Sequence, residues 1–140
     1  MNMKRGILTV LATVAIAPPP AEACRAPTRW HDPSDKPSDA VVEGVVASID
    51  TSERYLRSAN VRTTKRWLGR DKPETVQLTW SLGGGMCGPP GPIPQENQRL
   101  LIYLKEENQK LWPIGWSVID KEPDGWVIRQ QNEEAKQRVR

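Results

Sequence analysis

Residues 39–50, Asp-Ala-Val-Val-Glu-Gly-Val-Val-Ala-Ser-Ile-Asp, decide the fold of this chain. The run is rich in Val and Ile, which favour extended backbone, and polar residues bound it at both ends. Gly44 stands inside it, and a glycine inside a strand often marks a bend or a bulge. We therefore expect a strand over 39–50 that is bent or bulged at Gly44.

Four further segments have the pattern of strands. Residues 55–68 and 75–80 alternate between apolar and polar side chains, which predicts half-buried strands. Residues 98–105 are nearly all apolar, as expected for a central strand, and residues 110–118 predict a fifth strand that is irregular around Pro113. Five strands at short spacing, without alternating helices, indicate an all-β barrel or sandwich.

The other segments are predicted to be irregular, and one is left open. Residues 81–97 are rich in Gly and Pro and predict a long loop. Residues 24–38 read as an extended, Pro-rich arm. Residues 126–130 fit either a short edge strand or the start of a C-terminal helix, and residues 131–140 read as a polar, helix-prone tail. We expect a single domain over residues 39–130.

The start of the chain has the anatomy of a secretory signal peptide. A basic pair precedes an apolar stretch over 6–17 that is too short to span a bilayer, and Ala21 and Ala23 are the small residues that a signal peptidase requires. We expect a signal peptide over 1–23, export to the periplasm or the medium, and a mature chain that starts at Cys24. Cleavage removes two of 20 basic and one of 17 acidic residues, so the mature charge gives no reason to expect a nucleic-acid partner.

Cys24 and Cys87 are the two cysteines of the chain. Two cysteines in an exported chain most often form one disulfide, which here would stabilise the fold by about 4 kcal/mol on the chain-entropy model. Free thiols or a metal site are alternatives. A lipid anchor on Cys24, as in bacterial lipoproteins, is another, although Ala21 and Glu22 fit the lipoprotein pattern poorly.

Five short motifs appear in a characteristic order along the chain. They are Cys24, the strand Ala40-Val41-Val42-Glu43-Gly44-Val45-Val46, a strand ending Trp67-Leu68-Gly69, the pair Cys87-Gly88, and Leu101-Ile102-Tyr103-Leu104. Over roughly residues 24–119 the chain resembles netrin-like domains, the OB-fold barrels that include tissue inhibitors of metalloproteinases. The resemblance implies a five-stranded, OB-like Greek-key barrel and a bond between Cys24 and Cys87. Ala26 and the region of Trp116 lack the cysteines of the family's second disulfide, as expected for a diverged bacterial type.

The resemblance also implies a role for the N-terminus. In the inhibitors of this family, the α-amine and carbonyl of the first Cys chelate the zinc of a target protease. Cys24 matches that residue, and a terminal amine with a pKa of about 8 has an accessible neutral form. Arg25 stands where the inhibitors place the residue that enters the specificity pocket. We expect a secreted, non-enzymatic netrin-like binding module, with zinc-protease inhibition through Cys24 as an alternative.

Basic residues crowd the second predicted strand and its exit. The candidates for partner binding there are Arg57, Arg62, Lys65, Arg66 and Trp67; Arg54, Arg70 and Lys72 extend the group, and Glu53 and Asp71 oppose it. A basic stripe with an exposed Trp67 is typical of single-stranded nucleic-acid binding, but export favours anionic envelope glycans or lipid head groups instead. A solvated strand face without any ligand is the other interpretation.

The sequence gives little support for catalysis or a bound metal. His31, the only histidine, lies beside Asp32 in the Pro-rich arm without the spacing of a metal site. Residues 83–85 are three glycines, but no Gly-Lys-Ser/Thr follows, so a phosphate loop is not indicated. We expect no enzymatic activity, no cofactor and no metal. No later apolar run approaches the length of a membrane span.

The residues around Cys24 predict the form of the exported protein. Its mature form should start at Cys24, carry no lipid, and contain a Cys24–Cys87 disulfide, because the small residues before Cys24 direct cleavage there. Intact-mass measurement with N-terminal sequencing, before and after reduction, tests all three points. Two thiols that alkylate without reduction, or a diacylglyceryl mass on Cys24, would contradict the prediction.

Overall fold

The computed structural model describes residues 33–82 and 91–140. Its elements in chain order are a short 3-10 helix η1 (Pro33–Asp35), the strands β1 (Ala40–Asp50), β2 (Leu56–Leu68), β3 (Thr75–Ser81), β4 (Arg99–Glu107) and β5 (Lys110–Val118), and the helix α1 (Gly125–Arg138). The strands expected from the sequence are confirmed, with ends that differ by one or two residues. The expected extended arm contains η1 at its end; its part before residue 33 lies outside the described residues.

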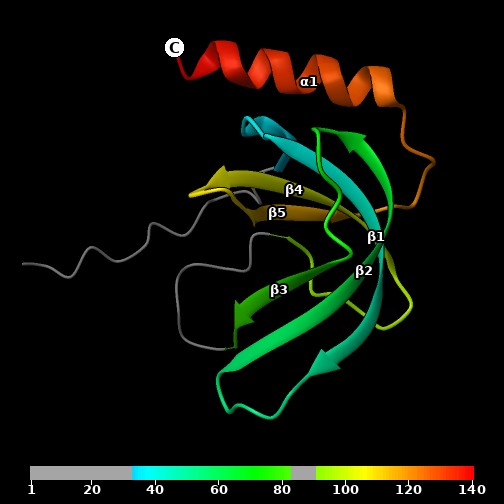
Figure 1. Ribbon diagram of the computed structural model, residues 1–140. Helices are drawn as coiled ribbons and strands as arrows, with labels where there is room; N and C mark the ends of the chain where they lie inside the picture. The colour runs from blue at the N-terminus through cyan, green and yellow to red at the C-terminus, as the bar shows by residue number, and fades with distance from the viewer. Residues whose placement is uncertain (1–32, 83–90) are drawn as a thin grey trace, which may run out of the picture.

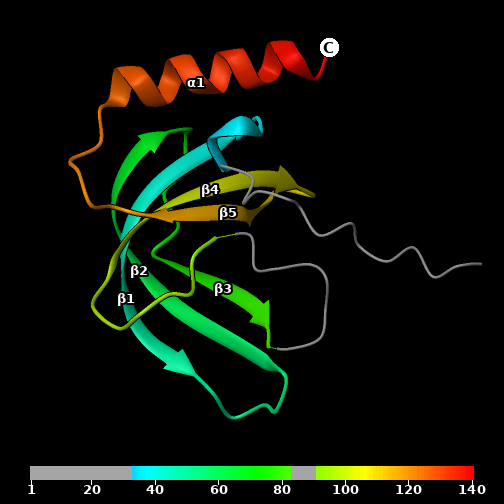
Figure 2. The same ribbon diagram turned by 180° about the vertical axis from the view of Figure 1, so that it is seen from behind.

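The five strands form one antiparallel sheet in the order β3-β2-β1-β4-β5. The sheet curls so that its two edge strands, β3 and β5, approach each other, and α1 lies across one end of the barrel (Figure 1). The view from behind shows the same arrangement (Figure 2). The fold is therefore a nearly closed, five-stranded OB-like barrel with a C-terminal helix, as the sequence predicts.

Gly44 marks an irregularity in β1, as expected. The register of β1 against β2 shifts between Glu43 and Gly44. A Cβ atom at Gly44 would lie 2.6 Å from Val61 Cγ1 and 2.8 Å from the carbonyl oxygen of Arg62. Gly44 therefore lets two backbones approach closely where the sheet bends, which no larger residue could do without displacing β2.

Strands β1 and β4 are buried on both faces over much of their length. Inward-facing residues of all five strands fill the barrel; they include Val42, Val46, Val61, Leu78 and Ile102. A second apolar cluster, formed by Val41, Leu101, Tyr103 and Ile128, lies on the outer side of β1 and β4, where α1 covers it. Successive residues of a strand point to opposite faces, so these two clusters explain the nearly continuous apolar runs of β1 and β4.

The barrel is closed from inside by two tryptophans at the seam between β3 and β5. The rings of Trp80 and Trp116 lie 6.5 Å apart, centroid to centroid, at 59°. Trp116 donates its indole N–H to the carbonyl oxygen of Pro92 at 2.7 Å. No β3–β5 ladder is present in the described sheet, so aromatic packing replaces backbone hydrogen bonds at this seam.

Helix α1 resolves the segment that the sequence left open. Residues 126–130 form the start of a helix, not an edge strand. Asp124 caps it by accepting the backbone N–H of Trp126 at 2.8 Å. The helix continues to Arg138 and buries Asn132 and Ala135, so the expected boundary between barrel and polar tail at residue 130 falls inside one docked element.

Asn132 ties this helix to the chain that enters β1. Its Oδ1 accepts the backbone N–H of Ser38 at 2.7 Å, and its Nδ2 donates to the carbonyl oxygen of Ser38 at 3.1 Å. Both residues are buried. The one side chain thus satisfies both backbone groups of Ser38, which would otherwise be buried without partners.

Replacing Asn132 with Ala should lower the free energy of unfolding by about 1–3 kcal/mol, because the donor and acceptor of Ser38 lose their partner in a buried place. Urea unfolding followed by circular dichroism measures the effect. Gln137→Ala, an exposed change on the same helix, is the control and should be nearly neutral. Equal stabilities of the two variants would contradict the role given to Asn132.

Candidate functional site

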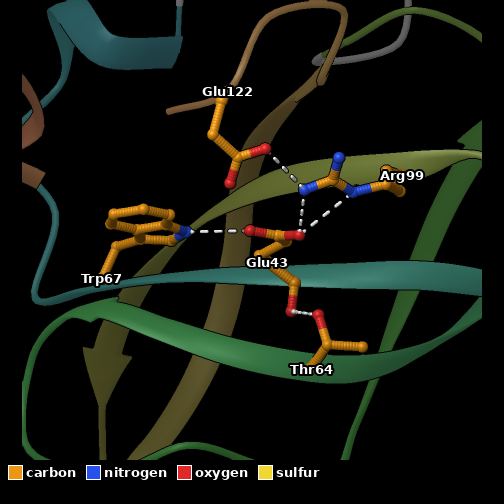
Figure 3. Close-up of polar contacts among 5 residues, drawn as sticks. All are labelled: Glu43, Thr64, Trp67, Arg99 and Glu122. Atoms are coloured by element: carbon orange, nitrogen blue, oxygen red, sulfur yellow. Dashed lines mark hydrogen bonds and ion pairs between the residues drawn. The ribbon is translucent and has the colours of Figure 1, made fainter. Parts of the chain in front are cut away.

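Glu43 is a buried carboxylate on the outer side of β1, and residues of β2 and β4 contact its side chain (Figure 3). Its Oε2 accepts the indole N–H of Trp67 of β2 at 3.1 Å. Its Oε1 accepts two hydrogen bonds from the Arg99 guanidinium, at 3.1 and 2.6 Å. Arg99 also reaches Glu122, in the connection before α1, at 3.3 Å. These four side chains are called the Glu43 network below.

Within the network, Arg99 compensates the buried charge of Glu43. Hydrogen bonds from the guanidinium to Glu43, and then to Glu122, raise the pKa of Arg99 above its usual value. Arg99 and Glu122 are exposed, whereas the Glu43 side chain is 8% exposed. A carboxylate at that depth requires a charged or hydrogen-bonding partner, and Glu43 has both. The arrangement holds β1, β2, β4 and the approach to α1 together.

Trp67 is partly buried, so it is not the exposed aromatic residue that the nucleic-acid-binding interpretation assumed. Its ring lies against Gly125, where an added Cβ would come within 3.2 Å of Trp67 Cε3. The ammonium nitrogen of Lys65 lies 3.7 Å from the ring centroid, a cation–π contact. Because Glu43 holds the indole nitrogen, the network also sets the position of Lys65.

Lys65 belongs to a group of cations around the connection between β2 and β3. We call this group the β2–β3 basic cluster; its members are Arg62, Lys65, Arg66, Arg70 and Lys72. Arg66 donates to the carbonyl oxygen of Arg70, and Lys72 to that of Thr63 at 3.4 Å. Arg62 pairs across the sheet with Thr75 at the start of β3. All five side chains are exposed.

Arg57 does not belong to this cluster, although it was a candidate from the sequence. It lies near the opposite end of β2, eight residues or roughly 25 Å from Lys65 along the strand. Its guanidinium bonds the carbonyl oxygens of Glu53 and Leu56, the latter at 3.0 Å. Arg54 lies nearby, with its guanidinium 5.3 Å from the ring centroid of Tyr55. The sequence stripe is therefore two groups, one at each end of β2.

The cluster is distinguished by how closely its cations follow one another in the chain, since other described cations, such as Lys110, Lys121 and Arg129, also make no ion pair. Within residues 33–82 and 91–140, the ion pairs are made by Arg99 and Lys105 of β4 and by Lys136 and Arg138 of α1. No cation of the β2–β3 basic cluster pairs with a carboxylate in these ranges. Asp71 and Glu74 lie in the same connection, so five positive charges face two negative ones.

The residues implied by the netrin-like resemblance cannot be placed. Cys24, Arg25, Cys87 and His31 lie outside the described residues. Their disulfide, acylation and zinc chelation therefore stay predictions. Among the residues that the structure does describe, no group of three or more His, Cys, Asp or Glu side chains is arranged to hold a metal ion. No helix in the same part of the chain is long and apolar enough to cross a membrane.

The Glu43 network was not predicted from the sequence. The sequence contained a signal for it, because Glu43 is a charged residue within the otherwise apolar run of β1. This strand lies in the middle of the sheet, between β2 and β4. A charge in such a run is either a surface position or a buried, paired carboxylate. Its ion-pair partner Arg99 is 56 residues away along the chain, and nothing local in the sequence connects the two.

Comparison with known proteins gives a distant structural likeness. No family model matches the chain, and no curated protein matches it. Among solved structures, OB4 of the yeast telomere protein Cdc13 aligns with 11% sequence identity and a TM-score of 0.25, over 71% of this chain and 81% of that one.

Replacing Glu43 with Gln should lower the free energy of unfolding by about 2 kcal/mol, because the amide nitrogen must face either Trp67 or Arg99, both of which are donors. Urea unfolding measures the loss, and the NMR signal of the Trp67 indole N–H should shift. Glu122→Gln, which changes the same charge at a site 69% exposed, is the control and should cost much less. Similar losses for both variants would show that net charge, not burial, matters here.

Proposed function

We propose that this protein is a non-enzymatic binding module whose β2–β3 basic cluster binds an anionic polymer, with acidic glycans of the cell envelope as the partner class. The observation that carries the proposal is that five exposed cations gather around one strand connection without a carboxylate partner in the described residues. Cations that only solubilise a surface are commonly interspersed with acids, as those of β4 and α1 are here.

The geometry supports binding to a polymer of charges better than to a single small anion. The cations stand along the end of β2 and around the turn to β3, so they present a surface and not an enclosed pocket. Lys65 is held over Trp67 and Arg66 over its own turn, which lowers the entropy lost when a ligand is bound. Repeated negative charges on a chain could engage several of these side chains at once.

The ordered motifs of the sequence support a netrin-like assignment for the module, and the signal peptide supports an extracellular or periplasmic partner. Export is the reason for choosing glycans over nucleic acids, because both polymers carry the charge that this cluster would recognise. The netrin-like type and the exported location are part of the proposal.

Dextran sulfate and neutral dextran form a matched pair of probes, since they share a backbone and differ in charge. The protein should bind dextran sulfate and not dextran, with an affinity that falls steeply between 50 and 300 mM NaCl. The triple variant Arg62→Gln, Arg70→Gln and Lys72→Gln should bind at least about tenfold more weakly and show a smaller salt dependence, because three charge contacts are lost. Titration calorimetry at several salt concentrations measures both quantities.

The control is a second triple variant, Lys110→Gln, Lys121→Gln and Arg129→Gln, which removes the same charge from exposed positions outside the cluster. It should change the affinity by about twofold or less. Equal losses in the two variants would mean that net charge alone drives binding. A clear preference for an oligothymidine over dextran sulfate of equal charge would contradict the proposed partner class.

A further inference from the structure

We propose that the seam between β3 and β5 binds an extended, uncharged peptide segment of a partner protein, which adds as a strand to the free edge of β3. This site is separate from the β2–β3 basic cluster and does not depend on polyanion binding.

The register of β3 shows which of its backbone groups face the seam. The bonds Thr63 N–H to Glu74 O at 3.0 Å and Leu82 N–H to Tyr55 O at 2.7 Å mark residues of the hydrogen-bonded pairs between β2 and β3. Hydrogen-bonded pairs alternate along an antiparallel ladder, so the even-numbered residues of β3 bond to β2. Thr75, Gln77 and Thr79 therefore direct their N–H and C=O groups away from β2, toward β5.

These backbone groups have no partner in the described part of the chain. β3 pairs only with β2, and the side chains of Thr75, Gln77 and Thr79 likewise make no hydrogen bond there. Over its seven residues β3 contains no proline, glycine or charged residue. Such devices normally prevent another strand from adding to an edge. The edge of β5, by contrast, carries Pro113 and a register shift.

A groove of about 410 Å³ runs beside this edge. Its lining comes from β3, from β5 and from the turn before β3, and comprises Pro73, Thr75, Val76, Gln77, Thr79, Leu111, Trp112, Pro113 and Trp116. None of these residues is charged, whereas the grooves beside α1 and around Asn132 contain acidic and basic side chains. Trp112 is 53% exposed and offers the groove a large apolar surface.

These features select the occupant. A regular row of unpaired donors and acceptors is what a peptide strand recognises, and about five residues would span Thr75 to Thr79. The uncharged lining favours uncharged side chains, because a charge buried there would have no partner. A second copy of this barrel fits poorly. If the β3 edges of two copies paired, the β5 strand beside each edge would collide with the β5 strand of the other copy. A single extended segment has no such flank.

The probe is the acetylated and amidated pentapeptide Thr-Val-Thr-Val-Thr, added to the ¹⁵N-labelled mature protein. Saturable shifts should appear at the amides of Thr75, Gln77 and Thr79 and at the Trp112 indole, and these amides should gain protection from hydrogen exchange. The same peptide N-methylated at every residue keeps the side chains but cannot form a ladder, so it should bind at least about tenfold more weakly.

Two variants at one position separate backbone from side chain. Gln77→Pro removes the N–H that faces the seam, at an edge position where proline is tolerated, and should weaken peptide binding at least fivefold. Gln77→Ala keeps that N–H and should bind within about twofold of the unmodified protein. Circular dichroism verifies that both variants fold. If Gln77→Pro does not fold, the comparison of the two peptides still decides the question.

Four results would overturn the proposal. The first is the absence of saturable shifts at the edge amides at millimolar peptide, and the second is equal binding of the N-methylated peptide. The third is exchange protection of the edge amides without peptide that rises with protein concentration, which would make a second copy the occupant. The fourth is a response of Trp112 and the edge amides to chitotetraose but not to the peptide, which would make the groove a saccharide site.

Discussion

The burial of both faces of β1 is the constraint on which the rest of this structure depends. Val41 and Val42 are adjacent in the chain and both are buried. Val41 lies under α1, and Val42 lies inside the barrel. A sheet that buries one face in a barrel leaves the other face in water unless something covers it. The helix at the C-terminus is therefore required by the composition of the first strand, and the two ends of the domain are coupled through Ser38 and Asn132.

The Glu43 network fits into this frame as the polar counterpart of the outer apolar cluster. Glu43 follows Val41 on the same face of β1. Val41 lies under α1, whereas Glu43 lies near the connection that precedes α1. Burying an unpaired carboxylate there would destabilise the fold. Hydrogen-bond donors from β2 and β4 offset this penalty. The same hydrogen bonds orient Trp67, so a buried residue of β1 also shapes the surface that carries Lys65.

Charge is distributed unevenly over the surface, and the two proposed sites follow this division. Arg99 and Lys105 of β4 and Lys136 and Arg138 of α1 are paired with acids. The cations around the β2–β3 connection are not paired in the described part of the chain, and the seam beyond β3 is lined there by uncharged residues alone. Pro73 lies at the junction between the last two regions. A ligand of repeated negative charge and an uncharged peptide would thus occupy neighbouring surfaces for different physical reasons, and neither needs the contacts of the other.

The sequence by itself determined the five strands, the bulge at Gly44 and the barrel class, because these follow from local periodicity and from the absence of alternating helices. It also located the cations, since charge is a property of the residue. What it could not decide was pairing over distance. Arg57 and Lys65 share one strand but lie at opposite ends of it, and the buried state of Glu43 depends on Arg99 and on the connection to α1. The burial of Trp67 depends in the same way on Gly125, which lies far from it along the chain and close to its ring in the fold. The free edge of β3 likewise depends on the tertiary structure, because only the folded barrel shows that β3 and β5 lie side by side without backbone hydrogen bonds between them.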